Sequence, residues 1–342
     1  MKKIIYSIFI IIVSLSQACI KDDVANNNEA IFNYIWTEMD ENYGGFIPRK
    51  INWDSIYVAY QPLAMASNTE DELWDICTSI IDVFDDQHIA IVDDVGKKGF
   101  ASGKIGDELL AEKEFNINVI KEQYLENNFT ALSVGDEDFV YGTIKNKNIG
   151  YIYMPHFSNI NDWYFEIDTA IEALLSTDGL IVDIRNNGGG APLIDRYVAS
   201  RFIAERKLAF SIQTRNGEAH TDFDEPTVYF AEAAGNQQYT KPTILLINHS
   251  TVSAGEEFAL FLETQNHITV VGDTTSNAFS TVAFTRFLPN GWRFMFPNQL
   301  YSYPDGSSPE GVGIIPDIYF QNDSLDIQNN IDKVLEKGIE LL

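Results

Sequence analysis

Three features of the sequence predict an α/β fold with a helical domain in front of it. From residue 146 onward, short apolar runs typical of buried strands alternate with segments patterned as helices. Residues 29–92 instead carry apolar residues at helical spacing throughout. The composition, 45% hydrophobic and 21% charged, can supply a large core. We therefore predict a helical N-terminal domain (29–92), a connecting region (93–145) and an α/β domain (146–342).

The helical domain is expected to contain three helices. They are predicted near residues 31–39, 53–64 and 70–84. Thr69 and Glu72 have the spacing of a capping box at the start of the third helix. Cys77 lies on the apolar face of that helix, so it is predicted to be a buried, unreactive thiol.

The α/β domain is predicted element by element from the same patterns. Residues 289–291 read Pro-Asn-Gly between two aromatic runs, which indicates a hairpin within residues 284–301. An amphipathic helix is predicted over residues 326–342. The connecting region is expected to hold two short strands, at 115–120 and 129–134. The remaining strands are predicted at 149–154, 180–184, 244–248 and 268–271, and the helices at 163–175, 192–204 and 254–264.

The N-terminus has the layout of an export signal. A basic start is followed by an apolar stretch over residues 4–18, which is short for a membrane span. The sequence Leu-Ser-Gln-Ala-Cys at 15–19 resembles a bacterial lipobox, in which the cysteine is lipidated after cleavage. We predict a lipoprotein signal peptide (1–18), lipid on Cys19, and a polar tether (19–28). A plain secretory signal is the alternative. The predicted location is the bacterial outer membrane, on its periplasmic or cell-surface side.

Charge and cysteine content exclude several classes of function. The formal net charge is −27 and no basic patch is visible, which argues against nucleic-acid binding. The same charge would be repelled by anionic membrane surfaces, so membrane contact is expected only through lipid on Cys19. The two cysteines form no Cys-x-x-Cys pair and no His/Cys spacing typical of metal sites. No metal or other cofactor is predicted.

Three stretches could carry chemistry. Residues 183–190 end in three glycines directly after a predicted strand, so their amides could face an anion, although a flexible turn is the simpler explanation. Ser253 lies where a predicted strand passes into a helix; it could be a nucleophile or only a helix N-cap with Glu256. His88 follows the third helix and is a candidate base or a structural histidine.

Together with two further stretches, these segments resemble the tail-specific (C-terminal processing) serine peptidase family. The resemblance covers residues 146–320, and the helical region with its Asp-Gln-His at 86–88 resembles the tricorn-like branch of that family. Four stretches occur in the family's order: residues 179–190, 251–256, 270–275 and 310–317.

The resemblance implies a crotonase-like (αββ) peptidase core with Ser253 as the nucleophile. It implies an oxyanion hole formed by the amide of Ala254 and an amide of Gly188 or Gly189. In the tricorn-like branch the base is a histidine of the N-terminal region, oriented by a glutamate; His88 and Glu310 match these positions.

The general base can also be argued from what is missing. Other branches use a lysine some two dozen residues after the serine, and no lysine occurs between Ser253 and Lys333. A Ser–Lys pair is therefore not expected. His249 and His156 remain competing bases. The resemblance places Asp183 and Arg185 beneath the glycine loop as scaffolding.

The predicted function is a serine-type endopeptidase acting on peptides or on unfolded or exported proteins. Residues 93–145 are too few and too irregular for the tail-reading PDZ domain of many family members, so recognition of substrate C-termini is not assumed. The alternatives are a non-catalytic binding protein for apolar ligands or peptides on the same fold, and an inactive homologue. Proximity of His88, Ser253 and Glu310 would favour the enzyme.

Overall fold

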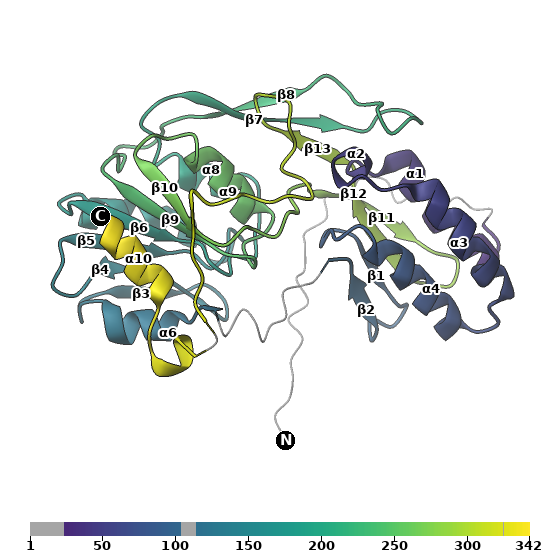
Figure 1. Ribbon diagram of the computed structural model, residues 1–342, viewed down its shortest axis with the longest axis horizontal. Coiled ribbons are helices and arrows are strands. Elements are labelled where there is room, and N and C mark those ends of the chain that lie inside the picture. Colours follow the sequence, from purple (N-terminus) through teal and green to yellow (C-terminus); the bar gives the residue numbers. More distant parts are fainter. Residues whose placement is uncertain (1–23, 104–113, 324) are drawn as a thin grey trace.

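The computed structural model describes residues 24–103, 114–323 and 325–342, so the predicted signal peptide and Cys19 lie outside the described residues. Two units stand side by side, and a small sheet spans the space above them (Figure 1). The first unit holds the N-terminal helices, and the second holds a large mixed sheet with helices on both faces. In the described part of the chain, no helix has the length and apolar character needed to span a membrane.

The N-terminal unit is built from helices whose ends match their caps. The side chain of Asn27 caps α1, and Thr69 with Glu72 forms the predicted capping box at the start of α4. The apolar faces bury Cys77, as predicted, together with Trp53 and Phe84. The helices are α1 (Asn28–Asn42), α2 (Phe46–Arg49), α3 (Trp53–Ala66) and α4 (Glu70–Asp82).

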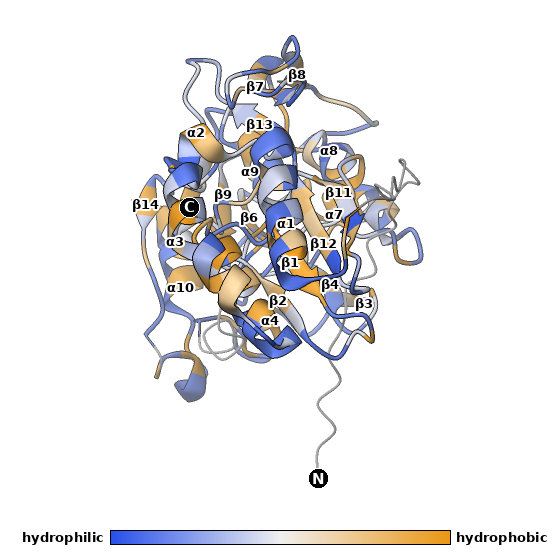
Figure 2. Ribbon diagram, turned by 90° about the vertical axis from the view of Figure 1, so that its right-hand side faces the viewer, coloured by the Kyte–Doolittle hydropathy of each residue, from blue (hydrophilic) through white to orange (hydrophobic). Residues whose placement is uncertain are grey.

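A hairpin from far along the chain completes this unit. Its strands β11 (Val282–Phe287) and β12 (Arg293–Pro297) join β1 (Ala90–Val92) and β2 (Gly99–Ala101) in one antiparallel sheet, ordered β11-β12-β1-β2. The predicted hairpin is therefore present, but it packs on the N-terminal helices, because its aromatic face needs their apolar surface. In Figure 2, β1 and β12 are orange, whereas α1 above them carries both blue and orange residues.

The large sheet of the core has seven strands in the order β14-β10-β9-β6-β5-β4-β3. The strands from β14 to β5 are parallel, β4 runs antiparallel to β5, and β3 runs antiparallel to β4. The region 93–145, predicted as a connection, thus contributes two strands of this sheet. The strands are β3 (Thr130–Ser133), β4 (Asp138–Thr143), β5 (Ile149–Tyr153), β6 (Gly179–Asp183), β9 (Thr243–Ile247), β10 (Ile268–Gly272) and β14 (Ile318–Tyr319).

Helices cover both faces of this sheet, which explains its continuous apolar strands. Along β6, Leu180 and Val182 face α7, α8 and α9, while Ile181 faces α10. These helices are η2 (Trp163–Phe165), α7 (Glu166–Leu174), α8 (Ile194–Ala199), α9 (Ala254–Leu262), η3 (Ile327–Asn329) and α10 (Lys333–Leu341). Because α9 and α10 cover opposite faces, Lys333 lies across the sheet from Ser253.

Two predicted elements differ in the structure. The strand predicted at 115–120 is a helical turn, α6 (Ile117–Val119) followed by η1 (Ile120–Tyr124), because the Asn116 side chain accepts the amide of Asn118 and starts a helix. The closing helix begins only at Lys333, because Asn330 adopts a left-handed conformation and Asp332 then caps α10.

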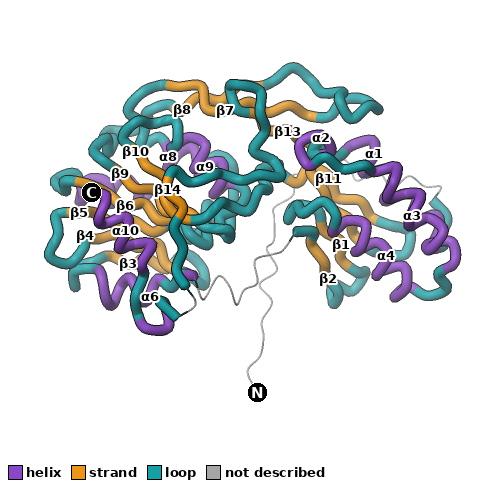
Figure 3. Tube along the Cα trace, in the orientation of Figure 1, coloured by secondary structure: helices purple, strands orange, loops and turns teal. Residues whose placement is uncertain are grey.

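A third, small sheet was not predicted. It contains β7 (Lys207–Thr214), β8 (Thr227–Ala231) and β13 (Gln299–Ser302) in the order β13-β7-β8, and it lies across the top of both units (Figure 3). Just after β7, the guanidinium of Arg215 donates to the carbonyl oxygens of Tyr43 (3.1 Å) and Glu41 (3.0 Å) at the end of α1. The small sheet therefore helps to hold the two units together.

Candidate active site

Ser253 lies at a sharp junction between a buried strand and a buried helix. β9 ends at Ile247, and α9 begins at Ala254. Ser253 has φ 58° and ψ −122°, a backbone conformation that a non-glycine residue adopts only when its surroundings enforce it. Such strain is typical of functional positions, and the helix N-terminus places a partial positive charge beside the hydroxyl.

The glycine loop packs directly against this serine. A Cβ atom on Gly189 would lie 2.7 Å from the Cβ of Ser253, and Gly189 has φ 79°, so only glycine fits there. The loop is tied to the serine segment because the amide of Val252 donates to the carbonyl of Asn187 (3.0 Å). The amide of Gly189 donates to Asn187 Oδ1 (2.9 Å), and that of Gly188 to the Pro155 carbonyl (3.2 Å). Either amide must leave its acceptor before it can hold an oxyanion.

Glu256 connects the nucleophile to the loop that follows β10. Its buried carboxylate accepts the amides of Ser253 (3.2 Å), Asn277 (2.8 Å) and Ala278 (3.0 Å), and the hydroxyl of Thr275 (2.6 Å). Burial raises the pKa of Glu256 to about 8, against the lowering effect of these donors. The amide of Ser253 also donates to the carbonyl of Ala278 (3.1 Å). Residues 275–278 are therefore fixed against the nucleophile.

The same loop contacts the segment that carries His88. The side chain of Gln87 donates to the hydroxyl of Ser276, whose amide in turn donates to the carbonyl of Thr251 (3.0 Å). The guanidinium of Arg49 donates both to the carbonyl of Asp85 (2.7 Å) and to that of Asn277 (2.7 Å). Residues 276–278 thus lie between the Ser253 junction and the His88 loop, and hydrogen bonds join them to both.

His88 is largely enclosed, with its side chain 12% exposed. Its Nδ1 atom has no hydrogen-bond partner, and it lies 3.7 Å from Oδ1 of Asp86. Desolvation lowers the pKa of His88; Asp86 acts against this shift, and Arg49 adds to it. His88 is therefore neutral at pH 7, which is the form a general base requires.

Glu310 is buried at the same place but is bonded to other groups. Its carboxylate accepts the amide and hydroxyl of Ser280, the amide of Phe279 (3.4 Å) and the guanidinium of Arg49 (3.4 Å). Burial raises the pKa of Glu310 to about 7, while Arg49 acts to lower it. Arg49 thus connects the carboxylate of Glu310 to the loop that carries His88.

The other histidines have different surroundings. In His156, Nε2 bonds to the carbonyl of Val134 (2.8 Å) and Nδ1 accepts the amide of Ser158 (3.2 Å), so both ring nitrogens are occupied. His267 precedes β10, at the opposite end of the parallel strands from Ser253. His220 stacks on Phe46 and bonds to Asp40.

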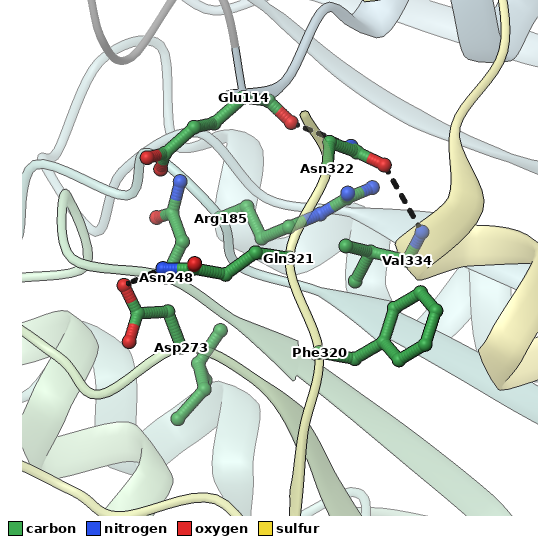
Figure 4. Close-up of a pocket in the computed structure, with 9 residues that line it drawn as sticks. Glu114, Arg185, Asn248, Asp273, Phe320, Gln321, Asn322 and Val334 are labelled. Atoms are coloured by element: carbon green, nitrogen blue, oxygen red, sulfur yellow. Dashed lines mark hydrogen bonds between the residues drawn. The ribbon is translucent and has the colours of Figure 1, made fainter. Parts of the chain in front are cut away.

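His249 follows β9 by two residues and is near Glu114, whose pKa is raised by burial while His249 acts to lower it; Glu114 borders a small cavity. Glu114, Arg185, Asn248 and Asp273 line this cavity (Figure 4). Its volume is about 10 Å³, room for about one water molecule, so no substrate side chain fits. Arg185, which lines the cavity, pairs with Asp183 (2.6 Å) and Asp332 (3.0 Å) in a buried network that joins the end of β6 to the start of α10.

The structure brings the predicted residues to one end of the large sheet. Ser253 and Ala254 meet the glycine loop directly, and the loops of His88 and Glu310 join them through residues 276–280. Sequence reasoning missed Arg49 as an organising residue, and it noted Asp86 and Glu256 only as members of motifs, without these contacts. Arg49 stood in no motif, and its contacts with Asn277 and Glu310 span more than 200 residues of sequence.

The α/β core with a helical unit in front of it has the crotonase-like fold that the sequence predicted. The chain belongs to peptidase family S41, whose sequence profile matches residues 148–320, about half of the chain. The profile of the tricorn protease C1 domain matches residues 25–81, within the helical unit.

Individual relatives agree with this assignment. The chain is 30% identical over 138 residues to the carboxy-terminal processing protease CtpA of Bacillus subtilis, covering 40% of this chain and 27% of that protein. It is 27% identical over 200 residues to the tricorn protease of Thermoplasma volcanium, covering 58% and 18%. A putative peptidase from Parabacteroides merdae has the same fold, with a TM-score of 0.81 and 27% identity over 93% of this chain and 97% of that chain. The chain therefore spans less than a third of the two curated proteases.

Proposed function

We propose that the protein is a serine endopeptidase in which Ser253 is the nucleophile and His88 the general base. The observation that carries the proposal is the loop 276–278, which is hydrogen-bonded both to the strained Ser253 junction and to the His88 segment. Membership of family S41 supports the same reaction class. Peptides and unfolded or exported proteins are the proposed substrates.

The proposed reaction is acyl transfer to the serine. His88 takes the proton from the hydroxyl of Ser253, which attacks the peptide carbonyl. The amide of Ala254, at the start of α9, and an amide of Gly188 or Gly189 would hold the oxyanion. The imidazolium then protonates the leaving amine, and water hydrolyses the acyl-enzyme. Glu310 supplies a carboxylate to the site from the α/β core.

Labelling with a fluorophosphonate probe tests the nucleophile. We expect the wild-type protein to be labelled and Ser253→Ala to remain unlabelled, because the probe reacts with an activated serine. His88→Ala should label at least about 1,000-fold more slowly. Ser250→Ala is the matched control, since it removes a hydroxyl from the same loop and should label normally. Equal labelling of wild type and Ser253→Ala would reject Ser253; loss in a His249→Ala variant, but not in His88→Ala, would assign the base to His249.

The non-catalytic alternative, binding of apolar ligands, has less support. Many aromatic residues pack against one another in the core; Phe157, Phe202 and Phe258, for example, form one contiguous group. The strained backbone at Ser253 is also costly to maintain without a function.

We also propose that Cys19 carries a lipid that anchors the protein to the bacterial outer membrane. The support is the lipobox-like stretch of the sequence, which ends nine residues before α1 begins. Cys19→Ala should block processing or move the protein from the membrane fraction to the soluble fraction. Unchanged fractionation and unchanged mass of the mature protein would contradict the proposal.

A further inference from the structure

We propose that Asp86 is the carboxylate that positions His88, and that Arg49 links this pair to Glu310. The proposal rests on His88 being the base, as proposed above. It assigns the acidic partner of the base to the helical unit, two residues from the histidine itself.

The geometry around the imidazole favours Asp86. Oδ1 of Asp86 lies 3.7 Å from Nδ1 of His88 and accepts the backbone amide of the same histidine at 3.0 Å. This hydrogen bond from the backbone amide of His88 fixes the carboxylate relative to the ring. Nδ1 is buried without a hydrogen-bond partner, so a small rotation of the ring or carboxylate would satisfy both groups.

Asp86 is held from the opposite side as well. The hydroxyl of Tyr43 donates to Oδ2 of Asp86 (2.7 Å), and the guanidinium of Arg49 lies 3.7 Å from the same atom. The backbone amide of Asp86 donates to the hydroxyl of Ser102 (3.3 Å). Asp86 is 1% exposed. A buried carboxylate fixed in this way can hold an imidazole in one orientation and one tautomer.

Glu310 is not free to do the same. Both of its carboxylate oxygens accept hydrogen bonds from Ser280 or Phe279, and one of them also pairs with Arg49. Among the described residues, the carboxylate within 4 Å of a ring nitrogen of His88 is that of Asp86, at 3.7 Å. The carboxylate of Glu310 lies instead 3.4 Å from the guanidinium of Arg49.

The four groups form a chain of alternating charge once the base is protonated. Imidazolium, Asp86 carboxylate, Arg49 guanidinium and Glu310 carboxylate follow one another at separations of 3.7, 3.7 and 3.4 Å. Asp86 stabilises the imidazolium directly, whereas Glu310 keeps Arg49 from neutralising Asp86. In this arrangement both carboxylates matter, but only Asp86 contacts the base.

The test is the rate of fluorophosphonate labelling of the full-length protein as a function of pH, for Asp86→Asn and Glu310→Gln. Asp86→Asn should lower the rate by about 10²- to 10⁴-fold. Its acidic midpoint should fall, because Asp86 raises the pKa of His88. The Asp86→Asn substitution leaves Tyr43, Arg49 and Glu310 unchanged in sequence. Glu310→Gln should cause a smaller loss and leave that midpoint unchanged.

Asp85→Asn is the matched control. Asp85 is the exposed neighbour of Asp86 in the same loop, and its φ of 50° suits asparagine. It should label like the wild type with the same midpoint. Asp86→Glu should recover part of the rate lost in Asp86→Asn, which a purely structural role would not require.

Two results would overturn the proposal. One is that Glu310→Gln lowers the labelling rate more than Asp86→Asn does and also shifts the acidic midpoint. The other is normal labelling of Asp86→Asn. If Asp86→Asn does not fold, Tyr43→Phe decides: it removes one hydrogen bond to Asp86 and should slow labelling several-fold, and an unchanged rate rejects the role. A wild-type protein that is never labelled would instead reject the proposed function itself.

Discussion

The core and the helical unit hold their proposed catalytic residues in different ways. Ser253 stands at the end of a buried strand, and its own helix supplies Glu256, which fixes the surrounding backbone. His88 stands on a loop between α4 and β1, where no regular element sets its position. Side-chain contacts from Arg49, Tyr43 and Gln87 hold that loop in place.

This difference shows where each residue's position is encoded. The setting of Ser253 depends on residues within a few positions of it, together with the glycine loop and residues 275–278. The setting of His88 depends on contacts between the two units, and Arg49 makes three of them, with Asn277 and Glu310. Changes near Ser253 should therefore act locally, whereas changes at Arg49 should separate the two parts of the site.

The largest effect is expected for Arg49→Ala. Arg49 is 3% exposed, and its loss leaves Asp86 and Glu310 buried without their shared cation. Breaking such a network should cost about 3–5 kcal/mol in the free energy of unfolding, measured in urea. Arg293→Ala, an exposed arginine of β12, should change it by less than about 0.5 kcal/mol. If Arg49→Ala is as stable as Arg293→Ala, Arg49 does not join the units.

A smaller effect is expected for Gly189→Ala, which tests the core alone. The added methyl would meet the Cβ of Ser253 at 2.7 Å, and φ is positive, so we expect a loss of about 2–3 kcal/mol together with slower serine labelling. Gly306→Ala has a similar φ, 86°, with nothing within 4 Å of the new methyl, so it should cost only about 1–2 kcal/mol. Equal losses in the two variants would show that the contact with Ser253 is unimportant.

The third prediction needs no mutation and reports on the helical unit. Burial raises the pKa of the Cys77 thiol to about 12 from its ordinary value near 9, so at pH 8 its thiolate fraction falls by about 1,000-fold. Iodoacetamide should therefore modify Cys77 only when the unit opens. Mass spectrometry during urea unfolding, compared with loss of fluorophosphonate labelling, shows whether both units open together. Rapid alkylation in the folded protein would contradict the burial.

Much of the fold was predictable because its elements are locally encoded. Apolar runs marked the parallel strands, and the capping box marked α4. The pairing of the 282–297 hairpin with β1 was not predictable, since an aromatic hairpin can cover any apolar surface. Nor was the small sheet of β7, β8 and β13, whose strands are half exposed and only weakly patterned.

The residues of the candidate site also differ in how far the sequence predicted them. Ser253, Ala254 and the glycines could be proposed as site residues because an ordered set of motifs carries them. Glu310 was placed by the same resemblance, but its bonds to Ser280 and Arg49 depend on tertiary structure. Arg49 carried no sequence signal, because it lies in a four-residue helix and acts on groups 35 to 261 residues away.

The insertion of β11 and β12 into the N-terminal sheet sets the order in which the molecule can mature. Residues 28–92 emerge early in synthesis, yet β1 has no inner neighbour until residue 297 has been made. The surface that holds His88 therefore stays incomplete until β12 has been synthesised. We expect the proposed base to take its place beside the core only after that point, so a nascent chain that ends before residue 297 should be inactive.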